Sequence, residues 1–159
     1  MTQSKKQQTI EELVGEFRAC CNLDGTFDGL AADRLRLNPT DLRCINIVEN
    51  AGGLGAGELA VEAGLTTGAV TGVIDRLERA GYARRVPDPG DRRRVRIEVT
   101  PAFYTDAGEI WGPVRADWET TLSNRFTTDQ LDHALAFLGA VNAISRRHLE
   151  RLRSVSDHR

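Results

Sequence analysis

The spacing of apolar residues changes along the middle of the chain, and the first part of this region has helical spacing. Residues 57–63 predict a short helix that ends at Gly64, because glycine readily adopts the left-handed conformation needed there. Residues 67–80 predict a second helix, with Thr66 as its N-terminal cap. Its apolar positions follow the pattern of a helix packed on one side: Val70, Val73, Ile74 and Leu77. The region is therefore expected to form a helix-turn-helix.

Alternating spacing, which is typical of β-strands, begins after Gly81. Residues 82–86 and 94–99 predict two strands joined by the turn Pro87-Asp88-Pro89-Gly90-Asp91. On the second strand, one set of side chains is expected to face the domain: Val95, Ile97 and Val99. The other set should face solvent or DNA: Arg94, Arg96 and Glu98. The sequence thus predicts a β-hairpin directly after the helix-turn-helix.

This hairpin is strongly charged, with six arginines and two aspartates between Arg84 and Arg96. A run of charge is ordinarily a solvated surface, but here it adjoins a predicted helix-turn-helix. Arginine at a hairpin tip can enter a narrow minor groove, where the negative potential of DNA is enhanced. We therefore expect Arg93 to contact DNA, with Asp91 orienting its guanidinium.

Three short motifs occur in this region: Gly57-Glu58-Leu59-Ala60, then Asp75-Arg76-Leu77-Glu78 with Gly81, and Asp88-Pro89-Gly90-Asp91-Arg92-Arg93 with Val99-Thr100. Together they resemble the MarR (multiple-antibiotic-resistance regulator) family of winged helix-turn-helix transcription factors. The resemblance implies a homodimer on a palindromic DNA operator, with each second helix in the major groove and each wing in the flanking minor groove. The expected function is transcriptional regulation, as a repressor that a small ligand releases from DNA.

By this resemblance, the DNA-binding residues lie at the second helix and on the wing: Thr66, Thr67, Thr71, Arg76, Asp91, Arg92, Arg93 and Arg94. Arg92 and Arg94 are expected to contact phosphates. Gly68, Ala69 and Gly72 offer little side chain to base edges, so DNA shape and phosphate contacts should supply much of the specificity.

Helical patterns occupy the rest of the chain, so the expected fold class is mainly α with a small β-wing. Residues 9–22 and 27–37 predict helices interrupted at residues 23–25, Asn38-Pro39-Thr40-Asp41 starts a helix that ends near residue 50, and residues 52–55 predict a turn. A later helix should bend at Gly112-Pro113, and a capping box at residues 127–130 starts the last one. One compact domain is expected, with N-terminal dimerisation helices (1–37), the winged DNA-binding region (38–100) and C-terminal dimerisation helices (101–159).

The last predicted helix carries an apolar stripe that is longer than one core of this size needs. Its residues recur at steps of mainly three and four: Leu131, Leu135, Leu138, Asn142, Leu149 and Leu152. We interpret the stripe as a dimer seam shared with the partner's N-terminal helix, in which Asn142 could fix the register. A purely intramolecular core is the alternative.

The family resemblance also implies a small lipophilic or aromatic effector bound between the dimerisation helices and the winged module. Candidate walls of such a pocket are Phe17, Cys20, Phe27, Leu30, Cys44, Phe103 and Trp111. An apolar stripe at helical spacing is more often part of the core, so a core role for these residues is the alternative.

Two other functions remain open. Cys20 and Cys21 could sense oxidants as thiols, although buried inert cysteines, including Cys44, are the simpler interpretation. A winged helix can also be a protein-interaction module without DNA binding. DNA affinity that falls steeply with salt would separate a DNA-binding protein from a docking module.

Composition narrows the remaining classes. The net charge of −2 and pI near 5.9 do not exclude DNA binding, because the basic residues cluster in one segment. His133 and His148 are too far apart for one metal ion, no catalytic constellation is recognisable, and neither an enzyme nor a cofactor is expected. The start of the chain has no apolar signal segment, and no apolar run is long enough to span a membrane, so we expect a cytoplasmic protein.

Overall fold

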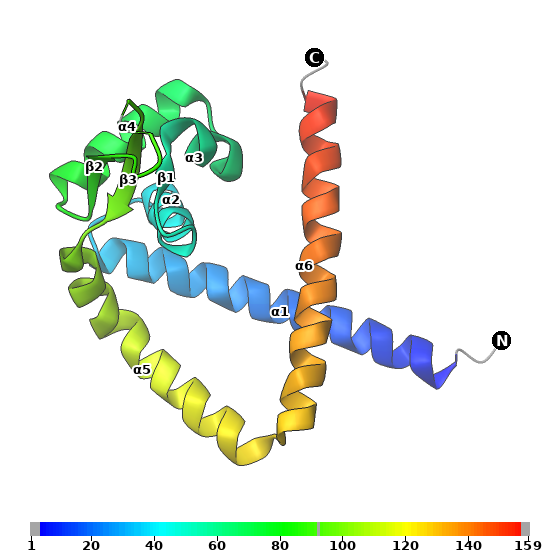
Figure 1. Ribbon diagram of the computed structural model, residues 1–159. Coiled ribbons are helices and arrows are strands. Elements are labelled where there is room, and N and C mark those ends of the chain that lie inside the picture. The colour runs from blue at the N-terminus through cyan, green and yellow to red at the C-terminus, as the bar shows by residue number, and fades with distance from the viewer. Residues whose placement is uncertain (1–3, 92, 157–159) are drawn as a thin grey trace. The chain divides into compact units, whose positions relative to one another are not determined.

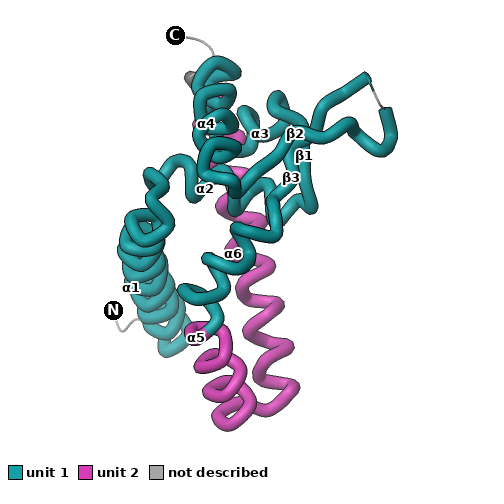
Figure 2. Tube along the Cα trace, turned by 90° about the vertical axis from the view of Figure 1, so that its left-hand side faces the viewer, with its two compact units in different colours: residues 1–112 teal, residues 113–159 magenta. Residues whose placement is uncertain are grey.

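The computed structural model describes residues 4–91 and 93–156, which form two compact units divided between Gly112 and Pro113. Figure 1 shows the order of the elements along the chain, and Figure 2 colours the two units. The first unit holds α1 (Lys5–Arg34), the winged module and the start of α5 (Pro101–Arg125). The second unit holds the rest of α5 and α6 (Thr128–Ser156).

The winged module follows from local signals that the structure confirms. Its elements are α2 (Pro39–Asn50), β1 (Leu54–Gly55), α3 (Ala56–Ala63), α4 (Thr67–Arg79), β2 (Ala83–Pro87) and β3 (Val95–Val99). Asn38 caps α2 by accepting the amide of Asp41, and Pro39 occupies the first turn. Thr66 caps α4 by accepting the amide of Ala69. These caps set where the two helices begin.

The turn of the helix-turn-helix depends on glycine, as expected. Gly64 has φ 64° and ψ 37°, the left-handed conformation, and the next amide, of Leu65, donates to the carbonyl of Ala60. Gly81, just after α4, has φ 78°. The predicted inner stripe of α4 is fully in the core, with Val70 and Leu77 both at 0% exposure. The helix therefore presents its opposite side to solvent.

The sheet has three strands in the order β1-β3-β2, all antiparallel. The prediction that residues 52–55 form only a turn is wrong, since Leu54 pairs with Ile97 and Gly55 with Arg96. A strand of two residues is too short to show an alternating pattern in the sequence. Val95 was expected to face the domain, but it is 54% exposed, because it lies where the hairpin extends past the core.

The N-terminal helix differs from its prediction. α1 is continuous from Lys5 to Arg34, without a break at residues 23–25. One glycine in a helix costs about 1 kcal/mol relative to alanine, which the neighbouring turns can absorb, and no proline stops the helix there. α1 also ends before residue 37, because Arg36 has φ 55°, and Leu35 and Leu37 turn into the core.

The long C-terminal helices begin at clear signals. Thr127 and Gln130 form the predicted capping box: the Thr127 amide donates to Gln130 Oε1 and the Gln130 amide to Thr127 Oγ1. α5 continues as a helix through Pro113, and the division between the two units falls at this residue. Phe103, in its first turn, is buried in the core of the first unit.

Candidate nucleic-acid interface

The outer face of α4 carries small side chains, two of which already make hydrogen bonds within the protein. Thr71 donates its hydroxyl proton to the carbonyl of Thr67, and the Thr66 hydroxyl accepts the capping bond from Ala69. Gly68 has open space around its α-carbon. Thr71 can therefore offer its methyl group and oxygen lone pairs to DNA, whereas the Thr66 hydroxyl keeps its donor; such short side chains fit sparse base readout.

Arg76 and Asp41 form a two-point ion pair that joins α4 to α2. Arg76 Nε and Nη2 lie 2.8 and 2.7 Å from the two carboxylate oxygens, and Asn38 adds a bond of 2.8 Å to Asp41. Asp41 is 2% exposed, whereas the Arg76 side chain is 42% exposed. The hydrogen bond to Asp41 raises the pKa of Arg76 above its ordinary value. Two of the Arg76 donors are thus committed inside the protein.

Three arginines of the charged hairpin are also held by the protein itself. Arg85 binds Asp75 and Glu78 of α4, and Arg84 pairs with Glu98 at 3.0 Å across the sheet. Arg96 was expected to face solvent or DNA, but its side chain is only 20% exposed and its guanidinium donates to the carbonyl of Gly52. These arginines brace the wing.

The tip of the wing is shaped by its two aspartates. Asp88 accepts the amides of Gly90 and Asp91, which fixes the turn. Asp91 accepts the backbone amide of Arg93 at 3.0 Å, and its carboxylate lies 3.6 Å from Arg94 Nε. The expectation that Asp91 orients the Arg93 guanidinium is therefore corrected: it orients the Arg93 backbone.

Arg93 itself is exposed, and its side chain has no carboxylate partner within residues 4–91 and 93–156. Arg94 is exposed too, with its guanidinium beside Asp91. Arg92, the other predicted phosphate contact, lies outside the described residues.

Sequence reasoning missed Arg79, which ends α4. Its Nε donates to the carbonyl of Asp75, it is exposed, and the described part of the chain places no carboxylate against its guanidinium. A helical wheel would have found it, because Gly72, Asp75 and Arg79 are three and four residues apart and share one face. Arg79 adds a positive charge to the outer side of α4.

A hollow of about 290 Å³ lies in the first unit between α1 and the start of α5. Its lining residues are Phe27, Leu30, Ala31, Arg34, Glu109 and Ile110. Of the predicted pocket walls, Phe27 and Leu30 are among them, and Trp111 packs edge-on against Phe27 with ring centroids 6.0 Å apart. Cys44 and Phe103 are instead buried in the core. Phe17 and Cys20 do not line this hollow.

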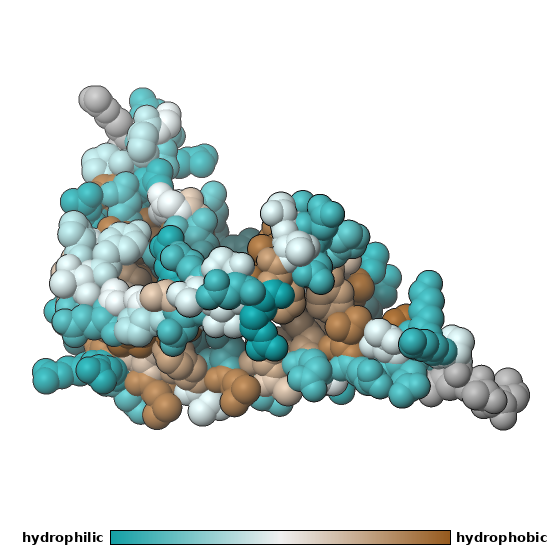
Figure 3. All heavy atoms as spheres, turned by 90° about the horizontal axis from the view of Figure 1, so that it is seen from below, coloured by the Kyte–Doolittle hydropathy of each residue, from teal (hydrophilic) through white to brown (hydrophobic). Residues whose placement is uncertain are grey.

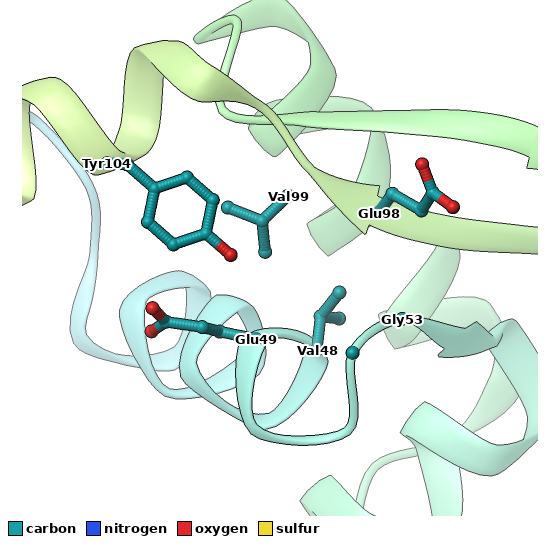
Figure 4. A pocket seen from close by; sticks show the side chains of 7 residues that line it. Val48, Glu49, Gly53, Glu98, Val99 and Tyr104 are labelled. Carbon is teal, nitrogen blue, oxygen red and sulfur yellow. The ribbon is translucent and has the colours of Figure 1, made fainter.

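Other hollows suit a lipophilic ligand less well. One of about 130 Å³ is lined by Val48 and Glu49 at the end of α2 and by Glu98, Val99 and Tyr104, which Figure 4 labels. This volume is well below the roughly 300–1,000 Å³ of small-molecule sites. An open groove of about 750 Å³ beside the wing is lined largely by glycine and charged residues, including Glu58, Asp88 and Asp91. The α1–α5 hollow is the better candidate.

The cysteines fall into two groups. Cys44 is buried, and desolvation raises the pKa of its thiol, so it is an inert core residue. Cys20 and Cys21 are exposed on α1, which corrects the expectation that all three are buried. Within the described residues, no group of three or more His, Cys, Asp or Glu side chains could hold a metal ion.

Large apolar side chains remain exposed on the long helices. On α6, Leu135 and Leu138 are 66% and 45% exposed, and Leu149 and Leu152 are 51% and 68% exposed. Of the other predicted seam positions, Leu131 is half-buried and Asn142 is exposed. Figure 3 shows brown apolar patches among hydrophilic surface on one face of the molecule. No helix in the described residues is long and apolar enough to cross a membrane.

The helix-turn-helix, its three-stranded wing and the exposed arginines define a winged helix-turn-helix DNA-binding protein. The sequence profile of the MarR family matches residues 37–95. The uncharacterized HTH-type transcriptional regulator YcgE of Bacillus subtilis is 36% identical over 152 residues, which cover 96% of this chain and 98% of that protein. The chain belongs to the MarR family of transcriptional regulators, which are not enzymes.

Solved structures agree on the fold, which confirms the predicted fold class. Transcriptional regulator Tm0710 of Thermotoga maritima superposes with a TM-score of 0.59 at 22% identity, over 90% of this chain and 98% of that one. A mutant of MepR from S. aureus, bound to an oligodeoxyribonucleotide, superposes with a TM-score of 0.53 at 18% identity, over 82% and 96%.

Proposed function

We propose that this regulator binds a palindromic operator as a homodimer, with α4 in the major groove and the wing tip in the flanking minor groove. The observation that carries the proposal is Arg93: it is exposed at the tip without a carboxylate partner in the described residues, while Arg84 and Arg85 are paired. The oligodeoxyribonucleotide bound to MepR supports a DNA duplex as the ligand of this fold. Thr67, Thr71 and Arg79 face the same groove from α4.

The exposed apolar side chains of α6 support a dimer. Leu135 and Leu138 lie one turn apart on one side of the helix, and Leu149 continues that side towards the C-terminus. A monomer rarely leaves so much apolar surface in water. Two linked winged modules also gain DNA affinity, because the second binds at the effective concentration set by the first.

A small effector would act at the hollow between α1 and the start of α5. Phe27 and Ile110 supply apolar contacts, and the Arg34 guanidinium supplies one positive charge. The hollow is near the lower end of small-molecule sites in volume, so an aromatic acid of one ring suits it. A ligand that changes the separation of the two α4 helices would release DNA, which is the action of a repressor's inducer.

The experiment that tests the proposal uses a fluorescein-labelled duplex, recovered by in vitro selection from random sequence with the wild-type protein. Anisotropy titrations compare Arg93→Ala with Arg115→Ala, which also removes one exposed arginine but lies in the second unit, paired with Glu119. Arg93→Ala should weaken binding by about 1–3 kcal/mol, whereas the control should change it little. Sedimentation should show a dimer.

The result that would overturn the proposal is a monomer that binds no duplex at low ionic strength. The protein would then be a docking module, as winged helices can be. A bound duplex whose affinity falls steeply with added salt separates the two functions, because counterion release accompanies phosphate contacts.

Thiol sensing is a second candidate, because Cys20 and Cys21 are both exposed. We infer that oxidation would convert these thiols to polar sulfenic acids or to disulfides, and that this change on α1 would alter the release of DNA. The test adds peroxide to the DNA complex of the Cys20→Ser, Cys21→Ser double variant. Equal release from variant and wild type would remove this candidate.

A further inference from the structure

Arg85 connects the wing to α4 through three bonds. Its Nη2 lies 2.7 Å from Asp75 Oδ1, its Nη1 contacts Glu78 Oε2, and its backbone amide donates to Glu78 Oε1 at 3.0 Å. Asp75 and Glu78 are one turn apart on α4. The planar guanidinium therefore spans two carboxylates of α4. This contact fixes the direction of β2 as well as its distance from α4.

The place of Arg85 in the sheet explains why this contact matters. Arg85 pairs with Ile97, so both side chains leave the same face of the sheet, the face that packs on the core. Ile97 is buried, but the next pair on this face, Pro87 and Val95, is exposed. Arg85 thus comes one pair before the exposed end of the hairpin, which Figure 2 shows extending from the rest of the first unit.

We propose that Arg85 is a positioning residue that sets the angle between the wing and α4, so that both can occupy neighbouring grooves. This proposal rests on the DNA-binding function proposed above. From Arg85 to the turn at residues 88–91 is roughly 15 Å at the rise of a β-strand. A 10° rotation at Arg85 would displace the tip by about 3 Å, half of the roughly 6 Å width of the minor groove.

A lysine at this position would keep the charge but not the geometry. The ammonium is a single point on a flexible chain and cannot bridge two carboxylates as a fixed fork. Arg85→Lys therefore separates positioning from general attraction to phosphates. Arg84→Lys is the matched control, because Arg84 is the neighbouring residue of β2 but points to the other face, where it pairs with Glu98.

The test is a double-variant cycle with Arg93→Ala, using the selected duplex described above. In the wild-type background Arg93→Ala should weaken binding about tenfold, within the range for one DNA contact. In the Arg85→Lys background its effect should fall below about threefold, because the tip no longer reaches the groove. In the Arg84→Lys background the tenfold effect should remain. Equal factors in all three backgrounds would overturn the proposal.

Hydroxyl-radical footprinting supplies a second measurement, whose expected result a general loss of stability would not produce. Hydroxyl-radical cleavage of the flanking minor grooves should be suppressed by wild type and Arg84→Lys, but not by Arg85→Lys at saturating protein. If Arg85→Lys does not fold, Glu78→Gln removes one of the two carboxylates and must show the same loss of flank protection. Unchanged protection in the folded variant refutes the positioning role.

The outcomes also separate this proposal from the function on which it rests. If wild type binds no selected duplex, the DNA-binding proposal fails, and Arg85 loses its role with it. If wild type binds and protects the flanks, but Arg85→Lys does so equally, only the positioning role of Arg85 fails.

Discussion

Replacing Arg76 with glutamine tests whether the ion pair with Asp41 holds α4 in place. The Asp41 carboxylate is almost fully buried and receives two bonds from Arg76 and one from Asn38. Glutamine is shorter and uncharged, so the variant leaves a buried negative charge with Asn38 as its remaining side-chain donor. The free energy of unfolding should therefore fall.

The magnitude follows from the number of bonds and from burial. A hydrogen bond to a charged group contributes about 1.5–3 kcal/mol, and breaking a fully buried ion pair costs about 3–5 kcal/mol. The Arg76 side chain is 42% exposed, so water can reach the carboxylate once the guanidinium is gone. We expect a loss of about 2–3 kcal/mol, which lowers the Tm by roughly 5–10 °C for a chain of this length.

The assay is urea unfolding followed by circular dichroism, at one fixed protein concentration because a dimer's stability depends on concentration. Arg76→Gln, Asp41→Asn and the double variant form a cycle, and Arg115→Gln is the control, since the Arg115–Glu119 pair is exposed at a similar separation of 2.8 Å. The control should change the free energy of unfolding little, because exposed ion pairs contribute little to stability. If Arg76→Gln loses no more than the control, the pair does not anchor α4.

Three further predictions concern the same unit. Burial and the hydrogen bond to Asp106 raise the pKa of Tyr82 to about 12, so the contribution of its hydroxyl to folding stability is present below pH ~10 and is lost as pH rises towards 12. The difference in free energy of unfolding between wild type and Tyr82→Phe should therefore narrow over this range in urea titrations at increasing pH. A constant difference would contradict this prediction. Gly72→Ala should raise stability by about 1 kcal/mol, because alanine favours a helix more than glycine does and the new methyl group would lie an ordinary 3.4 Å from Arg76. If DNA approaches α4 closely at this residue, the same methyl group should weaken duplex binding. An unchanged anisotropy titration would contradict this close approach. Thr66→Ala should lower stability by about 1 kcal/mol through loss of the cap, and an unchanged urea midpoint would exclude that role.

The features predicted well from sequence are those that depend on residues close together in the chain. The left-handed Gly64, the caps at Asn38 and Thr66, and the Thr127–Gln130 capping box each involve residues within four positions. The amphipathic stripe of α4 is likewise a local pattern. Local backbone requirements restrict the residue types so strongly that the sequence alone shows them.

The features that were missed depend on distant partners. β1 exists only because Leu54 and Gly55 meet β3, more than forty residues later. The Asp41–Arg76 pair joins residues 35 positions apart, and the Arg96 guanidinium reaches Gly52. Residue type alone cannot show which arginine finds an acid or a carbonyl in three dimensions, so the sequence predicted an Arg96 that faces solvent or DNA and showed no partner for Arg84 or Arg85.

The wing shows why a cluster of arginines in a sequence is not the same as a positive surface. Arg84 and Arg85 are neutralised by carboxylates of β3 and α4, and Arg96 is turned back to the body of the protein. Their pairing stiffens the hairpin and cancels acids that would otherwise repel phosphates beside α4. The positive charge that the described residues leave exposed here lies at Arg93 and Arg94 on the hairpin and at Arg79 on α4, which suits the proposed contacts with DNA. A chain with net charge −2 can thus present a basic tip, because most of its acids are dispersed or paired.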